Sequence, residues 1–361
     1  MIGIKSIASY VPTAGLDNYV QGAKFGKDEE FMFGKIGASF LPRKAEEQET
    51  SDLCVEAAQA LFASNPDLDP QSIDALIVVT QNGDEEGLPH TAAIVQSKLG
   101  LSTRVAAFDV SLGCSGYVYG LYAIKGFMEA AGLKNGLLIT ADPYSKIVDP
   151  EDRNTTMLFG DAATATWMGE NAVWNLGQAR FGTDGSGAEH LKVSDGKFSM
   201  NGRQVFNFAL IKVPAHLHEL LDASGLKSSD IDAFCIHQAV RRLSTPWRDA
   251  LKSNTRRSSS RTCWKPAIRC PPVFRCCCRS TCSMAAGSAW RSVASAWACR
   301  GARPSCTATD PSQPLKAPGG HRPALFSAEN KLLPNAARRR SGFTREEGSS
   351  VYGTGLAGVR G

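Results

Sequence analysis

Short apolar runs alternate with longer stretches of helical periodicity along the first 255 residues of the chain. An apolar run of about four to eight residues between turn-forming residues is typical of a buried strand. Such runs predict strands at residues 73–80, 105–110, 136–141 and 231–237. Strands that alternate with helices favour an α/β protein whose sheets are mostly parallel and covered by helices.

Two of the helical stretches have recognisable ends. The stretch at residues 51–63 opens on Ser51, a favourable N-cap residue. The stretch at residues 206–225 closes on Gly225, a residue type that commonly follows the last helical turn. We therefore predict two helices with these boundaries.

The pattern changes after residue 255, where neither helical nor strand periodicity continues. Eight of the eleven cysteines lie between Cys263 and Cys306, among Arg, Ser, Trp and Pro. Acidic residues are absent from Arg256 to Thr309. The net charge of +5 is therefore an average over two unlike regions.

Length and composition indicate a globular protein of enzyme size, since 361 residues with 43% hydrophobic content can bury a large core. The first residues have no basic region or small-residue cleavage site that would indicate a secretory signal. No apolar run reaches the roughly 18–20 residues that a membrane span needs. We expect a soluble cytoplasmic protein without a membrane span.

Cys114 has the surroundings of a reactive cysteine. It follows the predicted strand at residues 105–110 and precedes Gly116 and a helical stretch. A thiol at a helix N-terminus is stabilised as the nucleophilic thiolate by the helix dipole and free N–H groups. The alternative is a buried structural cysteine, because free Cys is among the most buried residue types.

His237 is the last residue of the predicted strand at residues 231–237 and directly follows its apolar run, where an imidazole could reach into a site. A single histidine at a strand end can equally be a hydrogen-bonded structural residue. A cysteine and a histidine at separate strand ends fit a nucleophile with a base or an electrostatic partner.

Three segments together resemble a known family. They read AAFDVSLGCSGYVYGL at 106–121, DRNTTMLFGDAATA at 152–165 and IDAFCIHQAVRRL at 231–243. In order and spacing they are similar to the signature regions of β-ketoacyl-acyl carrier protein synthase III, a thiolase-superfamily condensing enzyme. The resemblance covers residues 1 to about 255. It implies a thiolase-like five-layered αβαβα fold of two similar halves and a homodimer.

The resemblance also implies a reaction and two catalytic residues. Cys114 matches the nucleophile that accepts the acyl group of an acyl-CoA primer. His237 matches the histidine that, with an asparagine, stabilises the enolate formed when malonyl-acyl carrier protein loses CO2. The implied activity is decarboxylative condensation in fatty acid biosynthesis, with acyl-CoA and acyl carrier protein as partners and no metal or other cofactor.

Further positions match substrate-binding residues of the family. Phe31 stands where a tryptophan that stacks on adenine is common, and Lys35 where an arginine is usual; Lys keeps the charge but cannot form a bidentate fork. Arg153 matches an arginine near the CoA nucleotide. Leu88 matches a residue that crosses the dimer interface and closes the partner's acyl pocket.

Two residues beyond His237 belong to the same matched motif. Gln238 is part of the substrate-binding motif, and Arg242 is a candidate for docking the acidic carrier protein or, alternatively, a solvated helix charge. Val240 replaces the asparagine that is usual in this motif. Ala162 and Thr164 replace small residues after Gly160 and Asp161, which suggests altered backbone packing there.

The family's catalytic asparagine, expected some thirty residues after the histidine in a GNT-like loop, does not occur in the chain. Codons for residues 263–275 can be chosen so that reading from the third base spells LETGNTVSSSVP, which contains such a loop. The asparagine then spans the codons of Ala267 and Ile268. The same shift over residues 293–302 can spell GFGVGLSWGA, which resembles the family's C-terminal glycine loop.

We therefore predict four segments. Residues 1–170 form the N-terminal thiolase-like half, 171–255 begin the C-terminal half, 256–309 are its out-of-frame remainder, and 310–361 are a tail translated beyond the original stop. Such a chain lacks the asparagine, the glycine loop and the last strands. We expect impaired activity and exposed sheet edges.

The cysteine-rich tract offers alternative interpretations. Three consecutive cysteines, Cys276 to Cys278, are poorly placed to bind tetrahedral zinc, and a disulfide scaffold does not fit a cytoplasmic chain. The basic character of the tract could suggest nucleic-acid binding, but no ordered helix presents the arginines. We therefore expect no metal and no nucleic acid.

Two alternatives for the activity remain open, and a metal-binding module, testable by metal analysis of the purified protein, is a third interpretation. One is a thiolase-superfamily acyltransferase of secondary metabolism that uses the same cysteine and histidine. The other is a catalytically inactive partner subunit.

Overall fold

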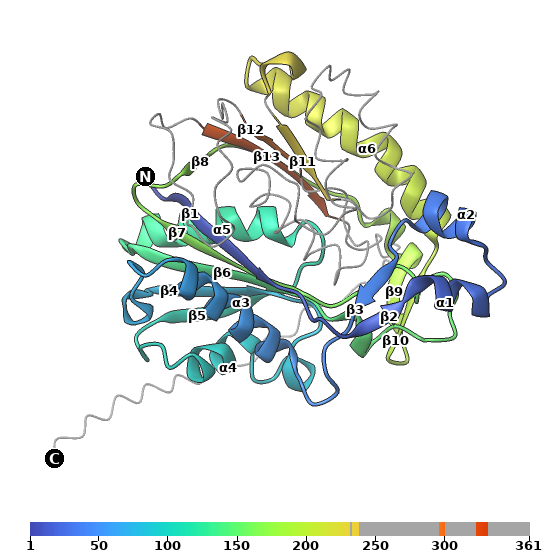
Figure 1. Cartoon of the computed structure of the whole chain (residues 1–361). Helices are drawn as coiled ribbons and strands as arrows, with labels where there is room; N and C mark the ends of the chain where they lie inside the picture. Colours follow the sequence, from blue (N-terminus) through green and yellow to red (C-terminus); the bar gives the residue numbers. More distant parts are fainter. Residues whose placement is uncertain (232, 238–295, 300–322, 331–361) are drawn as a thin grey trace, which may run out of the picture.

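The computed structural model describes residues 1–231, 233–237, 296–299 and 323–330, and its largest element is a nine-stranded sheet (Figure 1). In sheet order the strands are β11 (Ala233–Ile236), β12 (Ala296–Cys299), β13 (Pro323–Asn330), β8 (Trp174–Thr183), β1 (Gly3–Tyr10), β7 (Ala163–Gly169), β6 (Asn135–Ala141), β4 (Ala75–Val79) and β5 (Ala106–Val110). The four strands predicted from the sequence correspond to β4, β5, β6 and β11.

The sheet is mixed, so the prediction of mostly parallel sheets is wrong. Strand β4 is parallel to β5 and β6, and β8 is parallel to β13, whereas the other neighbours are antiparallel. The connection from β6 to β7 contains only a 3₁₀ turn, η4 (Tyr144–Lys146). A crossover between parallel strands usually contains an α-helix; this connection contains none, and β7 returns antiparallel to β6.

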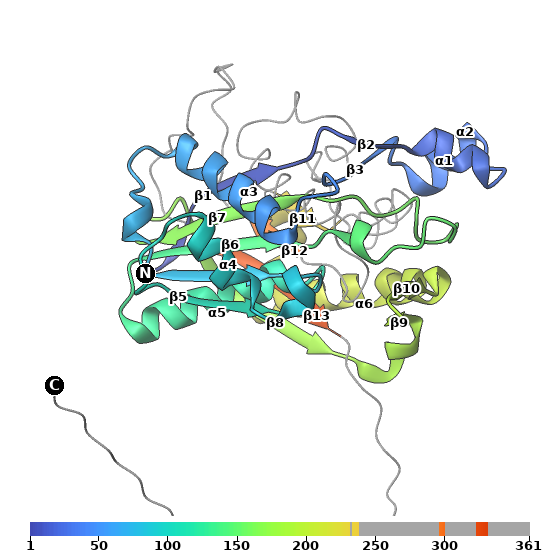
Figure 2. The same cartoon turned by 90° about the horizontal axis from the view of Figure 1, so that it is seen from below.

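Helices cover both sides of the curled sheet and complete a five-layered arrangement (Figures 1 and 2). Helices α3 (Thr50–Ser64) and α4 (Thr91–Lys98) pack on one face of the first-half strands, and α5 (Gly116–Ala131) packs on β4 and β6 from the other face. Helix α5 also contacts β13, and α6 (Gly202–Ala223) covers β8 and β13. The order of layers agrees with the predicted thiolase-like αβαβα fold.

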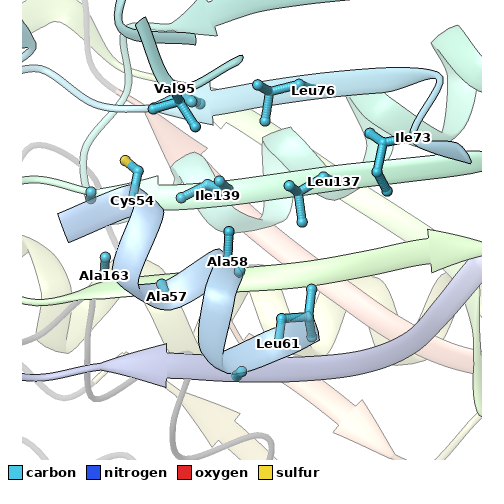
Figure 3. Packing of buried hydrophobic residues seen from close by; sticks show 14 of the residues in the cluster. Cys54, Ala57, Ala58, Leu61, Ile73, Leu76, Val95, Leu137, Ile139 and Ala163 are labelled. Carbon is cyan, nitrogen blue, oxygen red and sulfur yellow. The ribbon is translucent and has the colours of Figure 1, made fainter. Parts of the chain in front are cut away.

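The interface between α3 and the sheet is formed by small and aliphatic side chains (Figure 3). Cys54, Ala57 and Ala58 face Leu137 and Ile139 of β6, all of them buried. Alanine side chains let the helix approach the strands closely. Burial of apolar side chains of this kind contributes about 25 cal/mol for each Å² removed from water.

Helix α5 approaches the end of β4 closely through Gly116. A Cβ atom at this position would overlap the side chain of Val79. Behind this contact, Tyr117 and Leu121 are buried in the cluster that includes Ile77. The first turn of α5 is therefore fixed against the carboxyl end of β4.

The predicted helices are confirmed, with shifts at their starts. Helix α3 begins at Thr50, and the backbone N–H of Glu49 donates to Asp52 Oδ2, so Ser51 lies inside the helix rather than at its cap. Helix α6 begins at Gly202, before the predicted start, because the Asn201 side chain accepts from the N–H of Gln204. Its end agrees with the prediction, since Gly225 has a left-handed φ of 63° just beyond the last turn.

Smaller elements flank the large sheet. They are β2 (Gly15–Asp17), α1 (Asn18–Lys24), α2 (Glu29–Phe31), the π-helical turn η1 (Met32–Ile36), β3 (Phe40–Pro42), the 3₁₀ turns η2 (Pro70–Ser72), η3 (Asp84–Gly87), η5 (Gly185–His190) and η6 (Ser228–Asp230), and the strands β9 (Leu191–Ser194) and β10 (Lys197–Met200). Strands β2 and β3 form one two-stranded sheet, and β9 and β10 form another.

The structure describes much of the first two predicted segments and little of the last two. Strand β7 ends at Gly169, next to the first boundary expected after residue 170. The segments 256–309 and 310–361 lie outside the described residues except for β12 and β13. The boundaries and the shifted reading frame therefore stay predictions. Among the described residues, no helix is long and apolar enough to cross a membrane.

Candidate active site

Polar residues gather where the parallel strands β4, β5 and β6 end. Thr80 and Asn82 follow β4, Cys114 follows β5, and Asp142 follows β6. Because these three strands run in the same direction, their carboxyl ends meet at one edge of the sheet. In α/β folds this edge is the usual location of a ligand site.

Cys114 lies between the end of β5 and the start of α5. Its side chain is buried, and it immediately precedes Ser115, the N-cap residue of α5. The predicted position next to a helix N-terminus is therefore confirmed. The positive end of the helix dipole and the N–H groups of the first turn favour an anion at this place, either a thiolate or an oxyanion.

His237 follows β11 and is buried in the second half of the fold. Burial lowers the pKa of the imidazole from 6.5 to about 4, so the ring is neutral near pH 7. Within the part of the chain that the structure describes, neither ring nitrogen has a hydrogen-bond partner. A neutral imidazole has one N–H donor and one acceptor nitrogen available for a ligand. The neighbouring candidates Gln238 and Arg242 lie outside the described residues.

Cys54 is a useful contrast with Cys114, since both side chains are buried. Cys54 lies inside α3, and burial, followed by the charges of Asp84 and Asp109, raises the pKa of its thiol. A thiol of this kind stays protonated and unreactive. Cys54 therefore has a structural role.

Asp142 is a site residue that the sequence analysis missed. Its Oδ1 accepts hydrogen bonds from Gln81 N at 3.1 Å and from Asn82 Nδ2 at 2.6 Å. Its Oδ2 has no partner among the described residues, and burial raises the pKa of the carboxyl from 3.8 to about 7. The available signal was the position of an acidic residue directly after the apolar strand at 136–141.

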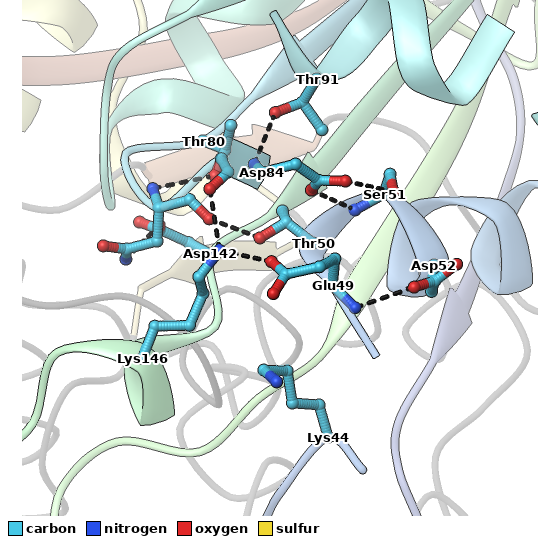
Figure 4. Close-up of polar contacts among 12 residues, drawn as sticks. Lys44, Glu49, Thr50, Ser51, Asp52, Thr80, Asp84, Thr91, Asp142 and Lys146 are labelled. Atoms are coloured by element: carbon cyan, nitrogen blue, oxygen red, sulfur yellow. Dashed lines mark hydrogen bonds and ion pairs between the residues drawn. The ribbon is translucent and has the colours of Figure 1, made fainter. Parts of the chain in front are cut away.

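A buried polar network connects this edge to the start of α3 (Figure 4). The Asp84 carboxylate accepts from Ser51 N at 2.9 Å and from Ser51 Oγ at 2.5 Å. Thr50 Oγ1 donates to the carbonyl oxygen of Asn82, and Lys146 Nζ donates to the carbonyl oxygen of Gly83 at 2.8 Å. The loop after β4 is thus hydrogen-bonded to α3 and to η4.

The candidate CoA residues Phe31 and Lys35 lie close together in sequence and structure. Phe31 ends α2, and Lys35 lies in the π-helical turn η1 that follows. Residues four apart in a helical segment lie on neighbouring positions of one face, and π-helical turns are frequent at functional sites. Lys27 Nζ lies 5.1 Å from the centroid of the Phe31 ring. An aromatic face with two cations fits a nucleotide base and its phosphates.

Arg153 and Leu88 lie in other segments. Arg153 is exposed in the connection between η4 and β7. Leu88 is 85% exposed in the loop between β4 and α4, and the bond to Pro89 is cis. The structure thus presents Leu88 at the surface, as a residue that contacts a partner subunit would be.

Asp161, in the second matched segment, links three parts of the chain. It is fully buried, and its carboxylate accepts from Lys44 N at 2.9 Å and from Ser145 N at 3.1 Å. Arg43 donates to the carbonyl oxygen of Phe159 next to it. Burial lowers the pKa of the Arg43 guanidinium, although the Asp161 carboxylate partly offsets this effect. These bonds hold the segment after β3 against the connection between β6 and β7.

Among the described residues, no group of three or more His, Cys, Asp or Glu side chains is arranged to hold a metal ion. The cysteine-rich tract at residues 263–282 lies outside the described residues.

Comparisons with known proteins agree on one family. Residues 108–185 match the family model described as 3-oxoacyl-[acyl-carrier-protein (ACP)] synthase III. The β-ketoacyl-[acyl-carrier-protein] synthase III of Staphylococcus haemolyticus is 34% identical over 253 residues, which are 69% of this chain and 80% of the relative. The synthase III of Staphylococcus epidermidis is 35% identical over the same shares of the two chains.

Solved structures give the same result. A 3-oxoacyl-(acyl-carrier-protein) synthase III structure matches with a TM-score of 0.65 and 32% identity, covering 71% of this chain and 84% of the other. The synthase III of Thermus thermophilus matches with a TM-score of 0.63 and 30% identity, covering 71% and 83% of the two chains. The chain therefore belongs to the β-ketoacyl-acyl carrier protein synthase III family.

Proposed function

We propose that this protein is a condensing acyltransferase of fatty acid biosynthesis that joins an acyl-CoA primer to malonyl-acyl carrier protein through an acyl-Cys114 intermediate. The observation that carries the proposal is the position of Cys114, buried at the end of β5 and directly before the N-cap of α5. Family membership, at 34% identity to a named synthase III, supports the same activity.

In the first half-reaction the Cys114 thiolate attacks the thioester carbonyl of acyl-CoA. The new C–S bond forms as the carbonyl oxygen becomes negative, and N–H groups at the start of α5 stabilise this charge. Collapse of the intermediate breaks the bond to the CoA sulfur, which leaves as a thiolate and takes up a proton. The acyl group remains on Cys114.

In the second half-reaction malonyl-acyl carrier protein loses CO2 and leaves a thioester enolate. The enolate carbon attacks the acyl-Cys114 carbonyl, a C–C bond forms, and the C–S bond to Cys114 breaks and restores the thiolate. His237 donates a hydrogen bond to the enolate oxygen. Its lowered pKa supports this role, because a neutral imidazole keeps one N–H and surrenders no proton to the enolate.

The remaining candidates bind the substrates. Phe31, Lys35 and Arg153 contact the CoA nucleotide, with the ring stacking on the base and the cations facing phosphate. Gln238 and Arg242 contribute to the substrate and carrier-protein surface. The protein acts as a homodimer in which Leu88 closes the partner's acyl pocket, and its 85% exposure supports this arrangement. A cytoplasmic location stays a prediction.

The reading-frame hypothesis predicts different results for the two half-reactions. Acylation needs Cys114 and the start of α5, whereas condensation also needs the asparagine that this chain lacks. We expect this chain to become acylated but to condense slowly, and a chain with the frame restored from about residue 256 to condense at an ordinary rate.

The test incubates both purified chains with an acyl-CoA and then with malonyl-acyl carrier protein. Intact mass reports the acyl adduct, and chromatography reports the 3-oxoacyl product. Failure of both chains to form the adduct would refute the proposed function. Equal condensation by both chains would refute the impairment alone. Sequencing the gene around codon 255, with the intact mass of the protein, decides whether the frame is shifted.

A further inference from the structure

The loop between β4 and α4 combines a buried base with an exposed tip. Asp84, at the start of η3, is only 4% exposed, whereas Leu88, four residues later, is 85% exposed. An isolated apolar side chain at a loop tip would ordinarily be mobile. The hydrogen bonds at the base of this loop counteract that mobility.

The base of the loop is held by the side chain of Asp84. Both carboxylate oxygens accept hydrogen bonds from Ser51 of α3: Oδ1 accepts from Ser51 N at 2.9 Å, and Oδ2 accepts from Ser51 Oγ at 2.5 Å. Ser51 Oγ also accepts from Lys98 Nζ at 2.8 Å. Charge-assisted hydrogen bonds of this kind, away from water, are about twice as strong as neutral ones. We call the Asp84–Ser51 pair the latch.

The two ends of the loop are held independently. At its start, Lys146 Nζ donates to the carbonyl oxygen of Gly83 at 2.8 Å. At its end, the Asp109 carboxylate accepts from Thr91 N at 2.7 Å and from Ala92 N at 2.8 Å, which fixes the first turn of α4. The chain between these points has little freedom as long as the latch is closed.

The backbone between the latch and the tip adopts a strained conformation. Glu85 and Glu86 have φ values of 46° and 57°, in the left-handed region that side chains other than glycine rarely adopt. Gly87 follows with a φ of 94°. Strain of this kind costs about 1–3 kcal/mol for each residue and persists only where the surroundings impose it. The latch supplies such a constraint directly before the two residues.

We propose that Asp84 is a positioning residue for primer selection. The latch fixes the backbone from Gly83 to Pro89 so that Leu88 projects at a constant place and height toward a second copy of this chain. There Leu88 limits the length of the acyl chain that the partner's pocket accepts. The inference rests on the proposed function, specifically on the dimer in which Leu88 closes the acyl pocket.

The test measures primer selectivity in the full chain. Rates of Cys114 acylation by acetyl-CoA and by octanoyl-CoA are followed by intact mass for the unmodified protein, Asp84→Ala, Leu88→Ala and the double variant. We expect Asp84→Ala to raise the octanoyl-to-acetyl ratio about tenfold, in the same direction as Leu88→Ala, since methylene-sized changes in a pocket alter discrimination by about this factor. If Asp84 acts through Leu88, the double variant has the ratio of Leu88→Ala alone.

The matched control is Asp74→Ala. Asp74 is also a carboxylate that anchors backbone N–H groups, those of Lys134 and Asn135, but it does so at the opposite end of β4 and β6. Its removal should leave the ratio unchanged. A shift equal to that of Asp84→Ala would show a general effect of lost stability and overturn the proposal.

The remaining outcomes distinguish a failure of the positioning role of Asp84 from a failure of the proposed function. An unchanged ratio in Asp84→Ala, with a shifted ratio in Leu88→Ala, overturns the positioning role and leaves the proposed function intact. An unchanged ratio in Leu88→Ala shows that Leu88 does not limit the acyl pocket, which overturns the inference. The absence of any acyl adduct refutes the proposed function itself. If Asp84→Ala does not fold, Ser51→Ala removes one of the two hydrogen bonds of the latch. A higher octanoyl-to-acetyl ratio in that variant then supports the proposal, and an unchanged ratio overturns it.

Discussion

The two ends of the parallel strands β4 and β6 are built differently. At the amino end, Asp74 Oδ2 accepts the N–H groups of Lys134 and Asn135, and Asn135 Oδ1 accepts from Trp167 Nε1 at 3.1 Å. At the carboxyl end, Asp142 is buried with one carboxylate oxygen unpartnered within the described residues. Buried polar groups are normally hydrogen-bonded, so an exception is informative.

This difference indicates that the amino end of β4 and β6 serves stability and the carboxyl end serves function. Satisfied polar groups at the amino end hold β4 and β6 together at little cost. At the carboxyl end, burial raises the pKa of Asp142 to about 7, and in the second half of the fold burial lowers the pKa of His237 to about 4. Perturbed titratable groups of this kind concentrate at functional sites. We therefore expect substitutions at the carboxyl end to alter chemistry and those at the amino end to alter stability alone.

The largest expected effect concerns the two buried cysteines. Cys114→Ala should abolish labelling by acyl-CoA, because the nucleophile is lost, whereas Cys54→Ala should be labelled at the normal rate. Intact mass after incubation with acyl-CoA measures both. An acyl adduct on the Cys114→Ala protein would remove the nucleophile assignment.

The next effect concerns His237, tested in the chain with the restored frame. His237→Ala should lower the condensation rate about 10²–10³-fold, the usual result of losing one donor to a developing oxyanion. Acylation of Cys114 should change by only a few fold. Equal losses in both half-reactions would show that His237 acts on the first step or on the fold.

A third prediction concerns the pH dependence of stability. The folded-state pKa of Asp142 is raised from 3.8 to about 7, so the folded protein binds more protons than the unfolded chain in this window. Ionisation of Asp142 should therefore reduce stability as pH rises from about 4 to 7, by roughly 4 kcal/mol.

Asp142→Asn, which resembles the protonated acid, should lose this slope. His237, with its lowered pKa, contributes the opposite slope between about 4 and 6.5, and it contributes equally to both proteins. The difference in unfolding free energy between the two, measured in urea from pH 4 to 8, isolates Asp142. A difference that is constant with pH would contradict the assignment.

The smallest effect is expected at the amino end. Asp74→Ala leaves the N–H groups of Lys134 and Asn135 without this acceptor and should lower the unfolding free energy by about 1–3 kcal/mol. The acylation rate of the folded variant should equal that of the unmodified protein. A lower rate at full folding would mean that the two ends are not separate in function.

Local patterns in the sequence predicted strands β4, β5, β6 and β11, helices α3 and α6, and the placement of Cys114 before α5, because burial and helix ends leave direct signals in the chain. Strand direction was not predictable, since it depends on the structure of each connection, as between β6 and β7, where no α-helix forms. The role of Ser51 was predicted wrongly because its partner, Asp84, is 33 residues away. Asp142 was missed for the same reason, because its partner Asn82 is 60 residues away.

The close contact between Gly116 and Val79 has a consequence for engineering this protein. The turn that carries Cys114 has no spare volume beside Val79, so enlarging a side chain there would displace Cys114 together with the first turn of α5. Leu88, which is 85% exposed, lies outside that contact, so a substitution at Leu88 leaves the packing of Gly116 on Val79 unchanged. We therefore expect substitutions near Val79, at the end of β4, to disturb the position of Cys114, and substitutions at Leu88, in the loop that follows β4, to leave it in place.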